Sequence, residues 1–598
     1  MSGGPTLNLG VIGNCIISAL IDRDARVVWN CLPRLDGDPV FHALIDATDS
    51  VEAAGFWSIE LSGAHRSEQS YLGNTAILCT RLYGDDGAAI EVIDFCPRFE
   101  VRGRMFRPQT LVRRVRALAG TPRVRVRLRP SFGYGAQRPA ITHGSNHIRY
   151  VCPERALRLT TDAPVSYVLS ETPFLLEGSA SFLLGADETL GESAEQTARE
   201  FQEETDAHWR QWARRLALPP EWQDAVIRAA ITLKLCTFEE TGAIVAAMTT
   251  SIPEAPRSGR TWDYRYCWLR DAYFVVRALN SLAEVETMEH YLRYLANVVG
   301  AAPDGHLQPV YGIALERRLQ EREITTLAGY RGMGPVRIGN QAYEHLQHDV
   351  YGNVILAASQ AFFDRRLLRP ATAQDFARLE QVGEQAYRVY AIPDASMWEL
   401  RTRKRVHTSS ALMCWAGCDR LARIAAHLGQ PDRAGLWQGR AAEIRGAIER
   451  EAWDAARGSF VDSFGGSDVE AGLLLMAEVG FLPADDVRFT GTVREVGRRL
   501  RRGRHLFRYA AADDFGVPST AFNICTFWYI DALARTGRTG EARELFEYML
   551  GCRNHLGLLS EDIDPETGEL WGNYPQTYSL VGIINAAMRL SAGWEGIG

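Results

Sequence analysis

Two glutamates of this sequence stand in surroundings that suit acid–base chemistry. Glu399 directly follows Trp398 in the segment SMWELR (residues 396–401), and Glu561 follows a pair of leucines. An apolar setting keeps a carboxyl group protonated, as a general acid must be. Glu399 is therefore a candidate proton donor, and Glu561 is a second carboxyl group whose position allows its side chain to point inward.

A structural interpretation of Glu399 competes with the catalytic one. A carboxylate at the start of a helix interacts favourably with the helix dipole. The next helical pattern begins near residue 408, nine positions further along the chain (408 − 399). Since the dipole acts only within the first turn, Glu399 is too far upstream to serve that helix. This position favours the catalytic interpretation.

A second group of candidate residues lies in the segment GRTWDYRYCWLRDAYF (residues 259–274). Aromatic rings stack on the C–H faces of a sugar, and arginine and aspartate form paired hydrogen bonds with its hydroxyl groups. We predict that Trp262, Trp268, Arg270 and Asp271 bind substrate. The alternative is a structural Arg-Asp pair among aromatic residues that only fill a core.

Other kinds of chemistry find little support in the sequence. His345 and His348 are three residues apart but have no third zinc ligand at a fixed spacing, and the acidic segment 558–580 lacks the EF-hand spacing. Phosphate-binding loops and Gly-x-Ser-x-Gly motifs are also missing. We therefore predict no metal and no cofactor. Carboxylates in an aromatic, arginine-lined cavity point to glycosyl transfer.

Composition narrows the partners and the compartment. The 598 residues carry a net charge of −7 and are 46% hydrophobic and 23% charged, as in ordinary globular proteins, which argues against nucleic acid as a partner and fits a small neutral substrate. No apolar stretch approaches the roughly 18 residues of a membrane span. Eleven scattered cysteines without a CxxC pair favour a reducing compartment, and the N-terminus lacks a basic signal-peptide region. We expect a cytoplasmic location.

The hydrophobic pattern divides the chain into three parts. Residues 1–190 alternate as antiparallel strands do, 191–220 form a charged helical linker, and 221–598 are helical. Segment RVRVRLR (residues 123–129) is typical of a half-buried strand with a solvated or salt-bridged arginine face, and a nucleic-acid-binding patch is the alternative. Twelve helices are expected, near residues 221–240, 270–283, 285–299, 344–363, 371–389, 408–428, 431–451, 468–479, 484–501, 519–536, 538–551 and 575–591.

Twelve helices in six pairs suggest a toroid of inner and outer helices. Paired helices can bury their apolar stripes only against neighbouring pairs. The fold class predicted is therefore an N-terminal antiparallel β-sandwich followed by an (α/α)6 barrel. A stacked α-solenoid would give a similar pattern, although no regular repeat of 34 or 40 residues is visible.

Five motifs in order resemble glycoside hydrolase family 15, which contains glucoamylases, glucodextranases and bacterial trehalases. Four lie in the helical part, and the fifth is similar to the opening of prokaryotic trehalase-like members. The motifs are WLRDA (268–272), MWELR (397–401), FRYAAADDFG (507–516), LSEDIDPETGEL (559–570) and the segment IGNCIISALIDRDARVVWNCLPRLDGDPVFHALID (12–46). The resemblance extends over nearly the whole chain.

The resemblance implies roles for individual residues. Glu399 corresponds to the general acid of the family and Glu561 to its general base. Further matches are Arg270 and Asp271, which would hold the nonreducing glucose, and Arg508, Trp398 and Tyr578, which would complete the sugar site. Tyr578 replaces a tryptophan of the fungal members, so stacking there would differ.

The family's chemistry implies inversion at the anomeric carbon, with the two carboxyl groups roughly 6.5–9.5 Å apart. Apolar surroundings should raise the pKa of Glu399, whereas Arg270 or Arg508 should hold Glu561 ionised against its adverse neighbour Asp562. Trehalose is the preferred expectation for the substrate. A glucoamylase-like or isomaltose-type α-glucosidase is the alternative, followed by a phosphorylase and a non-catalytic sugar-binding protein.

Overall fold

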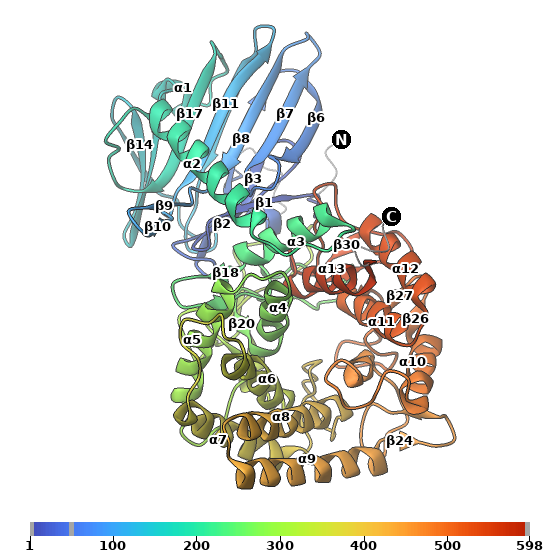
Figure 1. Cartoon of the computed structure of the whole chain (residues 1–598). Coiled ribbons are helices and arrows are strands. Elements are labelled where there is room, and N and C mark those ends of the chain that lie inside the picture. The colour runs from blue at the N-terminus through green and yellow to red at the C-terminus, as the bar shows by residue number, and fades with distance from the viewer. Residues whose placement is uncertain (1–4, 47–52, 593–598) are drawn as a thin grey trace.

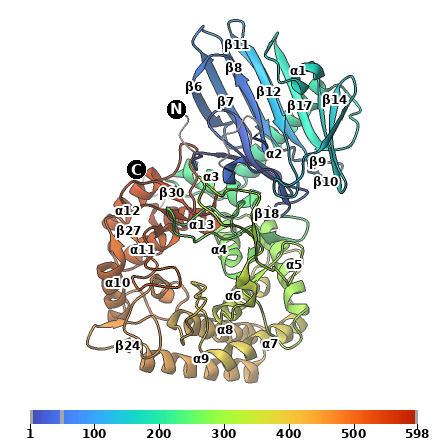
Figure 2. The same ribbon diagram turned by 180° about the vertical axis from the view of Figure 1, so that it is seen from behind.

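The computed structural model describes residues 5–46 and 53–592. A domain of strands lies above a ring of helices, and a long helix joins the two (Figure 1). The same arrangement is visible from behind (Figure 2). This order confirms the fold class predicted from the sequence.

Two antiparallel sheets form the N-terminal part of the described chain. The first contains β1 (Gly10–Gly13), β2 (Ser18–Ile21), β3 (Arg26–Leu32), β4 (Asp38–Phe41), β5 (Phe56–Leu61), β12 (Arg123–Arg129) and β16 (Phe174–Leu175). The second contains β6 (Ala64–Tyr71), β7 (Leu78–Gly84), β8 (Ala89–Phe95), β11 (Leu111–Ala119), β13 (Ala140–His143), β14 (His147–Cys152), β15 (Arg155–Thr161) and β17 (Ser179–Ala186). Helix α1 (Val165–Leu169) and the hairpin of β9 (Phe99–Val101) and β10 (Arg104–Phe106) flank them.

Strand β12 shows why this region folds as a sandwich. Its apolar side chains, Val124, Val126 and Leu128, are buried in the core shared by the two sheets. Its arginines point the other way and form ion pairs, for example Arg125 with Glu60. The alternation of the sequence therefore places one face in the core and the other in contact with solvent and acids. The predicted salt-bridged strand face is confirmed.

Helix α2 (Ala194–Arg214) corresponds to the predicted linker. It begins at Ser193, whose side chain accepts a hydrogen bond from the backbone of Gln196. Ala194 and Ala198 pack in a small core with strands of the second sheet, so the helix lies across the outer face of that sheet (Figure 1). The proposed boundaries at residues 190 and 220 fall in the loops on either side of α2, and they stay a proposal.

The helical part contains eleven α-helices and one longer 3-10 helix among the described residues after 220, besides a short 3-10 turn before α6. They are α3 (Gln223–Leu235), α4 (Leu269–Ser281), α5 (Glu286–Gly300), α6 (Asp349–Phe363), α7 (Ala373–Val389), α8 (Thr408–His427), α9 (Pro431–Glu451), η3 (Ala471–Met476), α10 (Val487–Leu500), α11 (Asn523–Arg535), α12 (Thr539–Gly551) and α13 (Thr577–Leu590). Eleven of the twelve predicted helices are confirmed as α-helices, with ends that differ by a few residues.

The helices form a closed ring. Inner elements contact one another in the order α4, α6, α8, η3, α11 and α13, and α13 packs back against α4. Inner helix α8 is buried along most of its length, whereas its outer neighbour α9 buries only one stripe. Contact between the first and last inner helices excludes the solenoid, which has open ends. The barrel is therefore closed, as predicted.

The helix expected over 468–479 is shorter and of another type. Only Ala471–Met476 is helical there, as a 3-10 helix. Glu470 has extended backbone and pairs with Tyr509, and Gly480 has a φ of +84°. Because Glu470 is extended and paired with Tyr509, the helix cannot begin before residue 471.

The sandwich and the barrel share a continuous core. Trp29 of β3 belongs to the same buried cluster as the inner helices, and its indole N–H donates to the carbonyl of Met248 at 2.8 Å. No helix within residues 5–46 and 53–592 is long and apolar enough to cross a membrane. All eleven cysteines are free thiols.

Candidate active site

A pocket of about 880 Å³ opens at one end of the barrel. Its walls come from the segments that precede the inner helices α4, α6, α8, α11 and α13. All nine sequence-predicted residues line it, namely Trp262, Trp268, Arg270, Asp271, Trp398, Glu399, Arg508, Glu561 and Tyr578. Residues that are up to 316 positions apart (578 − 262) are thus brought together by closure of the ring.

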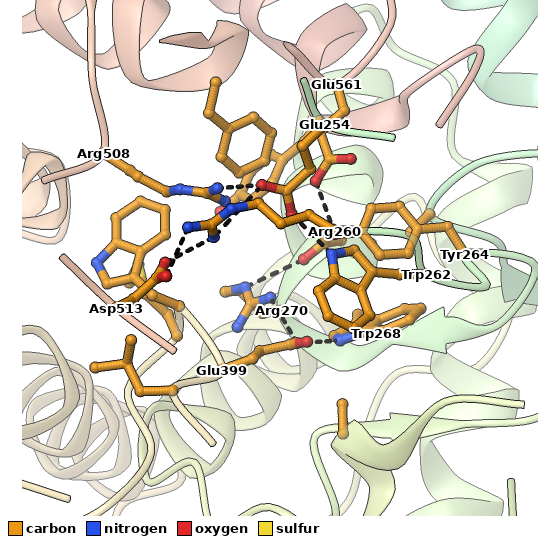
Figure 3. A pocket seen from close by; sticks show the side chains of 18 of the residues that line it. Glu254, Arg260, Trp262, Tyr264, Trp268, Arg270, Glu399, Arg508, Asp513 and Glu561 are labelled. Carbon is orange, nitrogen blue, oxygen red and sulfur yellow. Dashed lines mark hydrogen bonds and ion pairs between the residues drawn. The ribbon is translucent and has the colours of Figure 1, made fainter. Parts of the chain in front are cut away.

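One extended segment, residues 261–268, supplies donors to three carboxyl groups of the pocket. The side chains of Trp262, Tyr264 and Trp268 face the pocket, while those of the intervening odd-numbered residues are buried on the opposite side. Alternation of this kind is what an extended backbone imposes. A single backbone segment therefore positions three hydrogen-bond donors in one row (Figure 3).

Glu399 sits in a tight turn with its carboxyl group in the pocket. Its backbone has a φ of +59°, and its N–H donates to the carbonyl of Ser396 at 3.2 Å. Oε1 accepts a hydrogen bond from Trp268 Nε1 at 2.6 Å and lies 3.8 Å from Arg270 Nη2. The side chain is 24% exposed, so the carboxyl group can reach a bound molecule.

Glu561 is more deeply placed than Glu399. The residue is 1% exposed, and its Oε1 accepts a hydrogen bond from the hydroxyl group of Tyr264 at 2.7 Å. Oε2 has no hydrogen-bond partner among the described residues. A free lone pair on a buried carboxyl group at the pocket wall is suited to accept a proton or a hydrogen bond from a bound molecule.

The electrostatics differ from those expected from the sequence. Burial raises the pKa of Glu561 well above its ordinary value, with further increases from the nearby charges of Asp562 and Glu254. The Tyr264 hydrogen bond and the charge of Arg508 act in the opposite direction. The carboxyl group of Glu399 meets one hydrogen-bond donor and one positive charge, because Trp268 and Arg270 reach it from another segment.

Arg270 and Asp271 form the inner end of the pocket. Arg270 Nε donates to Asp271 Oδ1 at 3.1 Å, and its Nη1 donates to Gln347 at 3.1 Å and lies 3.8 Å from Asp349. Burial and the charge of Glu399 raise the pKa of Asp271 to about 6, although the adjacent guanidinium lowers it. Both residues stand in the first turn of α4, as the motif WLRDA predicts.

Arg508 belongs to an ionic cluster on the other side of the pocket. It pairs with Glu254, which also accepts a hydrogen bond from Trp262 Nε1 at 2.8 Å. Arg260 lies 3.9 Å from the same carboxylate and donates two hydrogen bonds to Asp513, at 2.6 and 2.7 Å. The cluster places two cations and two anions beside the sugar-sized cavity (Figure 3).

Trp398 and Tyr578 form an aromatic wall. Trp528 lies between them, with ring centroids 6.2 Å from Trp398 and 5.6 Å from Tyr578. Trp398 Nε1 donates to the buried Glu470, which holds the indole in place from outside the pocket. The hydroxyl group of Tyr578 is buried and has no partner among the described residues.

Four further residues of the site were not predicted from the sequence. They are Glu254, Arg260, Tyr264 and Asp513. The alternation of aromatic residues at 262, 264, 266 and 268 could have revealed Tyr264, since every second residue of an extended segment shares a face. Glu254 gives no local signal, because its partners Arg508 and Trp262 lie in other segments.

Comparisons with known proteins identify the family of the chain. Residues 221–588 match the model of glycosyl hydrolases family 15, and residues 4–172 match that of the trehalase-like N-terminal domain. A trehalase of Thermoplasma volcanium is 30% identical, with 97% of this chain and 93% of the relative covered. A trehalase of Mycobacterium tuberculosis is 31% identical, with 98% and 89% covered.

A solved structure shares the fold. A bacterial glucoamylase complexed with acarbose superposes with a TM-score of 0.70 at 13% identity, covering 98% of this chain and 94% of the other. The family model spans more than half of the chain and contains every predicted site residue. This chain is a glycoside hydrolase and belongs to glycosyl hydrolases family 15.

Proposed function

We propose that this protein is an inverting, exo-acting α-glucosidase whose preferred substrate is α,α-trehalose. The observation that carries the proposal is the pair of glutamates in one pocket, each bound to a donor of the same segment, Glu399 to Trp268 and Glu561 to Tyr264. Inverting hydrolysis needs two carboxyl groups with different roles. The surroundings of the two carboxyl groups differ, since that of Glu399 is partly exposed and that of Glu561 is buried.

In the proposed reaction Glu399 is the general acid and Glu561 the general base. Glu399 donates a proton to the glycosidic oxygen as the bond from that oxygen to the anomeric carbon breaks. A water molecule attacks the carbon from the opposite face, and Glu561 takes one proton from it. Glu399 ends ionised and Glu561 protonated, so the charges balance.

The remaining predicted residues would bind the sugar. Arg270 and Asp271 would hold the hydroxyl groups of the nonreducing glucose at the inner end, since a guanidinium next to a carboxylate offers donors and acceptors side by side. Arg508 would contribute from the opposite wall. Trp262, Trp268, Trp398 and Tyr578 supply aromatic surface for the ring faces and methylene group.

The choice of trehalose rests on the relatives. Both trehalases cover nearly the whole chain, and the N-terminal domain matches a trehalase-like model. Glucoamylase-like or isomaltose-type activity is the second candidate, supported by the shared fold with a bacterial glucoamylase. We keep the cytoplasmic location as a prediction, because eleven free cysteines suit a reducing compartment.

The test is hydrolysis of a panel that contains trehalose, maltose, isomaltose, nigerose, maltotriose and soluble starch, with the anomer of the product followed by NMR. Trehalose should be the best substrate and give one α-glucose and one β-glucose. Maltose as the best substrate would support the second candidate. Initial release of the nonreducing glucose of maltose as the α anomer would contradict inversion, and activity that requires phosphate would indicate a phosphorylase.

A further inference from the structure

The segment that carries the donors of the pocket is held from behind by the N-terminal sandwich. Arg265 lies between Tyr264 and Tyr266, is fully buried and points away from the pocket. Its guanidinium donates to Asp263 through Nε at 2.9 Å and Nη2 at 2.7 Å. Since the two residues pair within the segment, the positive charge is balanced where it is buried.

The other bonds of this guanidinium go to the sandwich. Nη1 donates to the carbonyl of Gly37 at 2.7 Å, and Nη2 donates to the hydroxyl oxygen of Tyr134 at 2.8 Å. Gly37 lies in the loop between β3 and β4, and Tyr134 lies in the loop between β12 and β13. One planar group thus joins two loops of the sandwich to the catalytic barrel.

The alternating side chains of residues 263–265 connect Arg265 to the proposed catalytic carboxyl groups. Asp263 and Arg265 flank Tyr264 in an extended segment, so their side chains fix the backbone on one side while the tyrosine ring projects from the other. The hydroxyl group of Tyr264 bonds to Glu561, and its ring contacts that of Trp268, which bonds to Glu399. A displacement of Arg265 would therefore move Tyr264, the hydrogen-bond donor of Glu561, before it moved Trp268.

We propose that Arg265 is a positioning residue through which the N-terminal sandwich fixes Tyr264, and through it the carboxyl group of Glu561. The proposal rests on the proposed function, in which Glu561 is the general base. It gives the sandwich a part in catalysis although, among the described residues, none of its side chains lines the pocket. Misplacement by about 1 Å is enough to reduce a rate by about 100-fold.

The first experiment changes the two partners of one hydrogen bond between the sandwich and the barrel, Tyr134 and Arg265. Tyr134→Phe removes one acceptor in the sandwich, and Arg265→Lys keeps the charge but loses the planar fork. Both should lower kcat by about 10- to 100-fold with little change in KM. The acid limb of kcat/KM should move to higher pH, because loss of the Tyr264 hydrogen bond removes an interaction that lowers the pKa of Glu561.

A matched control separates positioning from stability. Arg98 is also a buried arginine of the sandwich, and it donates two hydrogen bonds to Glu239 of the barrel at 2.7 and 2.9 Å. Neither residue lines the pocket. Arg98→Lys should lower the melting temperature but leave kcat and the pH profile unchanged. Equal effects of Arg98→Lys and Arg265→Lys on the pH profile would overturn the proposal.

A double-mutant cycle tests the route of the effect. If Arg265 acts through Tyr264, Arg265→Lys should add little to the loss of kcat caused by Tyr264→Phe. Additive losses would contradict this route. Crystals of Arg265→Lys give a readout without substrate, since the Tyr264–Glu561 hydrogen bond should lengthen or break, and an unchanged bond would overturn the proposal. Failure of the proposed function would appear instead in the parent protein, as the absence of glucose release from every sugar of the panel.

Discussion

Tyr264 and Trp268, whose ring centroids lie 5.2 Å apart, donate hydrogen bonds to the two different glutamates of the pocket. Residues 264–268 of one extended segment therefore reach both proposed catalytic carboxyl groups. A shift of this segment would alter the geometry of acid and base together.

Replacing either proposed catalytic glutamate should nearly abolish hydrolysis. Glu399→Gln and Glu561→Gln keep the shape of the side chain but cannot exchange protons, so each should lower kcat by about 10²- to 10⁴-fold. Initial rates with the best substrate of the panel provide the measurement. Glu566→Gln is the matched control, because Glu566 is an exposed acid of the same loop as Glu561. If Glu399→Gln and Glu561→Gln hydrolysed the substrate as fast as the parent, the two-carboxylate mechanism would be wrong.

The charge of Glu254 should influence the pH below which activity is lost. Burial, Asp562 and Glu254 raise the pKa of Glu561, so hydrolysis should fail below a pH that is higher than for an ordinary carboxylate. Glu254→Gln removes one like charge and weakens the pairing of Arg508, and both changes favour ionised Glu561. The acid limb of kcat/KM should therefore move to lower pH.

The matched control for Glu254→Gln is Glu323→Gln, since the side chain of Glu323 is 59% exposed and does not line the pocket. This variant should keep the pH profile of the parent. If the acid limb of kcat/KM has the same pH in Glu254→Gln as in the parent, Glu254 does not influence the group that titrates.

The hydroxyl group of Tyr578 should contribute to substrate binding and not to the stability of the fold. It is buried at the pocket without a partner among the described residues, so a sugar hydroxyl is its natural partner. Tyr578→Phe should raise KM by about 3- to 10-fold, the value of one neutral hydrogen bond. Its melting temperature should not fall. Tyr294→Phe provides the contrast, because it removes a buried hydrogen bond to Gly312 at 2.9 Å and should lower stability.

Glu470 should contribute stability that is lost as the pH rises. Burial raises the pKa of this carboxyl group from 4.5 to about 8 in the folded protein. Between these values the folded state binds more protons than the unfolded state, so unfolding becomes easier with increasing pH. Glu470→Gln removes this titration and keeps an acceptor for Trp398. The melting temperature of the parent should therefore drop more between pH 5 and pH 8 than that of the variant.

Glu544→Gln is the control for this measurement, since Glu544 is exposed on α12. It should reproduce the pH dependence of the parent. If Glu470→Gln and the parent lost the same number of degrees between pH 5 and pH 8, Glu470 would have no part in the effect.

Much of the architecture was readable from the sequence, because periodicity is a local property. The alternation in residues 123–129 and the helical stripes after residue 220 depend only on near neighbours, and both appear as predicted. The exception, η3, begins only after Glu470, whose backbone pairs with that of Tyr509. That pairing joins segments 39 residues apart (509 − 470), so no local pattern announces it.

The identity of the candidate site residues also came from short motifs, and all nine meet in one pocket. The electrostatic surroundings of these residues could not be predicted from the motifs. The neighbours of Glu399 in the chain are apolar, yet in the structure Trp268 donates a hydrogen bond to its carboxyl group and Arg270 brings a positive charge close to it. Glu561 meets the charge of Glu254, from a segment about 300 residues upstream (561 − 254 = 307).

The sequence by itself therefore determined the elements and the residue types of the site, whereas the tertiary structure decided what each carboxyl group meets. The same holds for Arg265, whose role depends on Gly37 and Tyr134 of another domain. The physical reason is that a pKa and a side-chain position depend on burial and on charges within a few ångströms, and closure of the ring, not order along the chain, sets those distances.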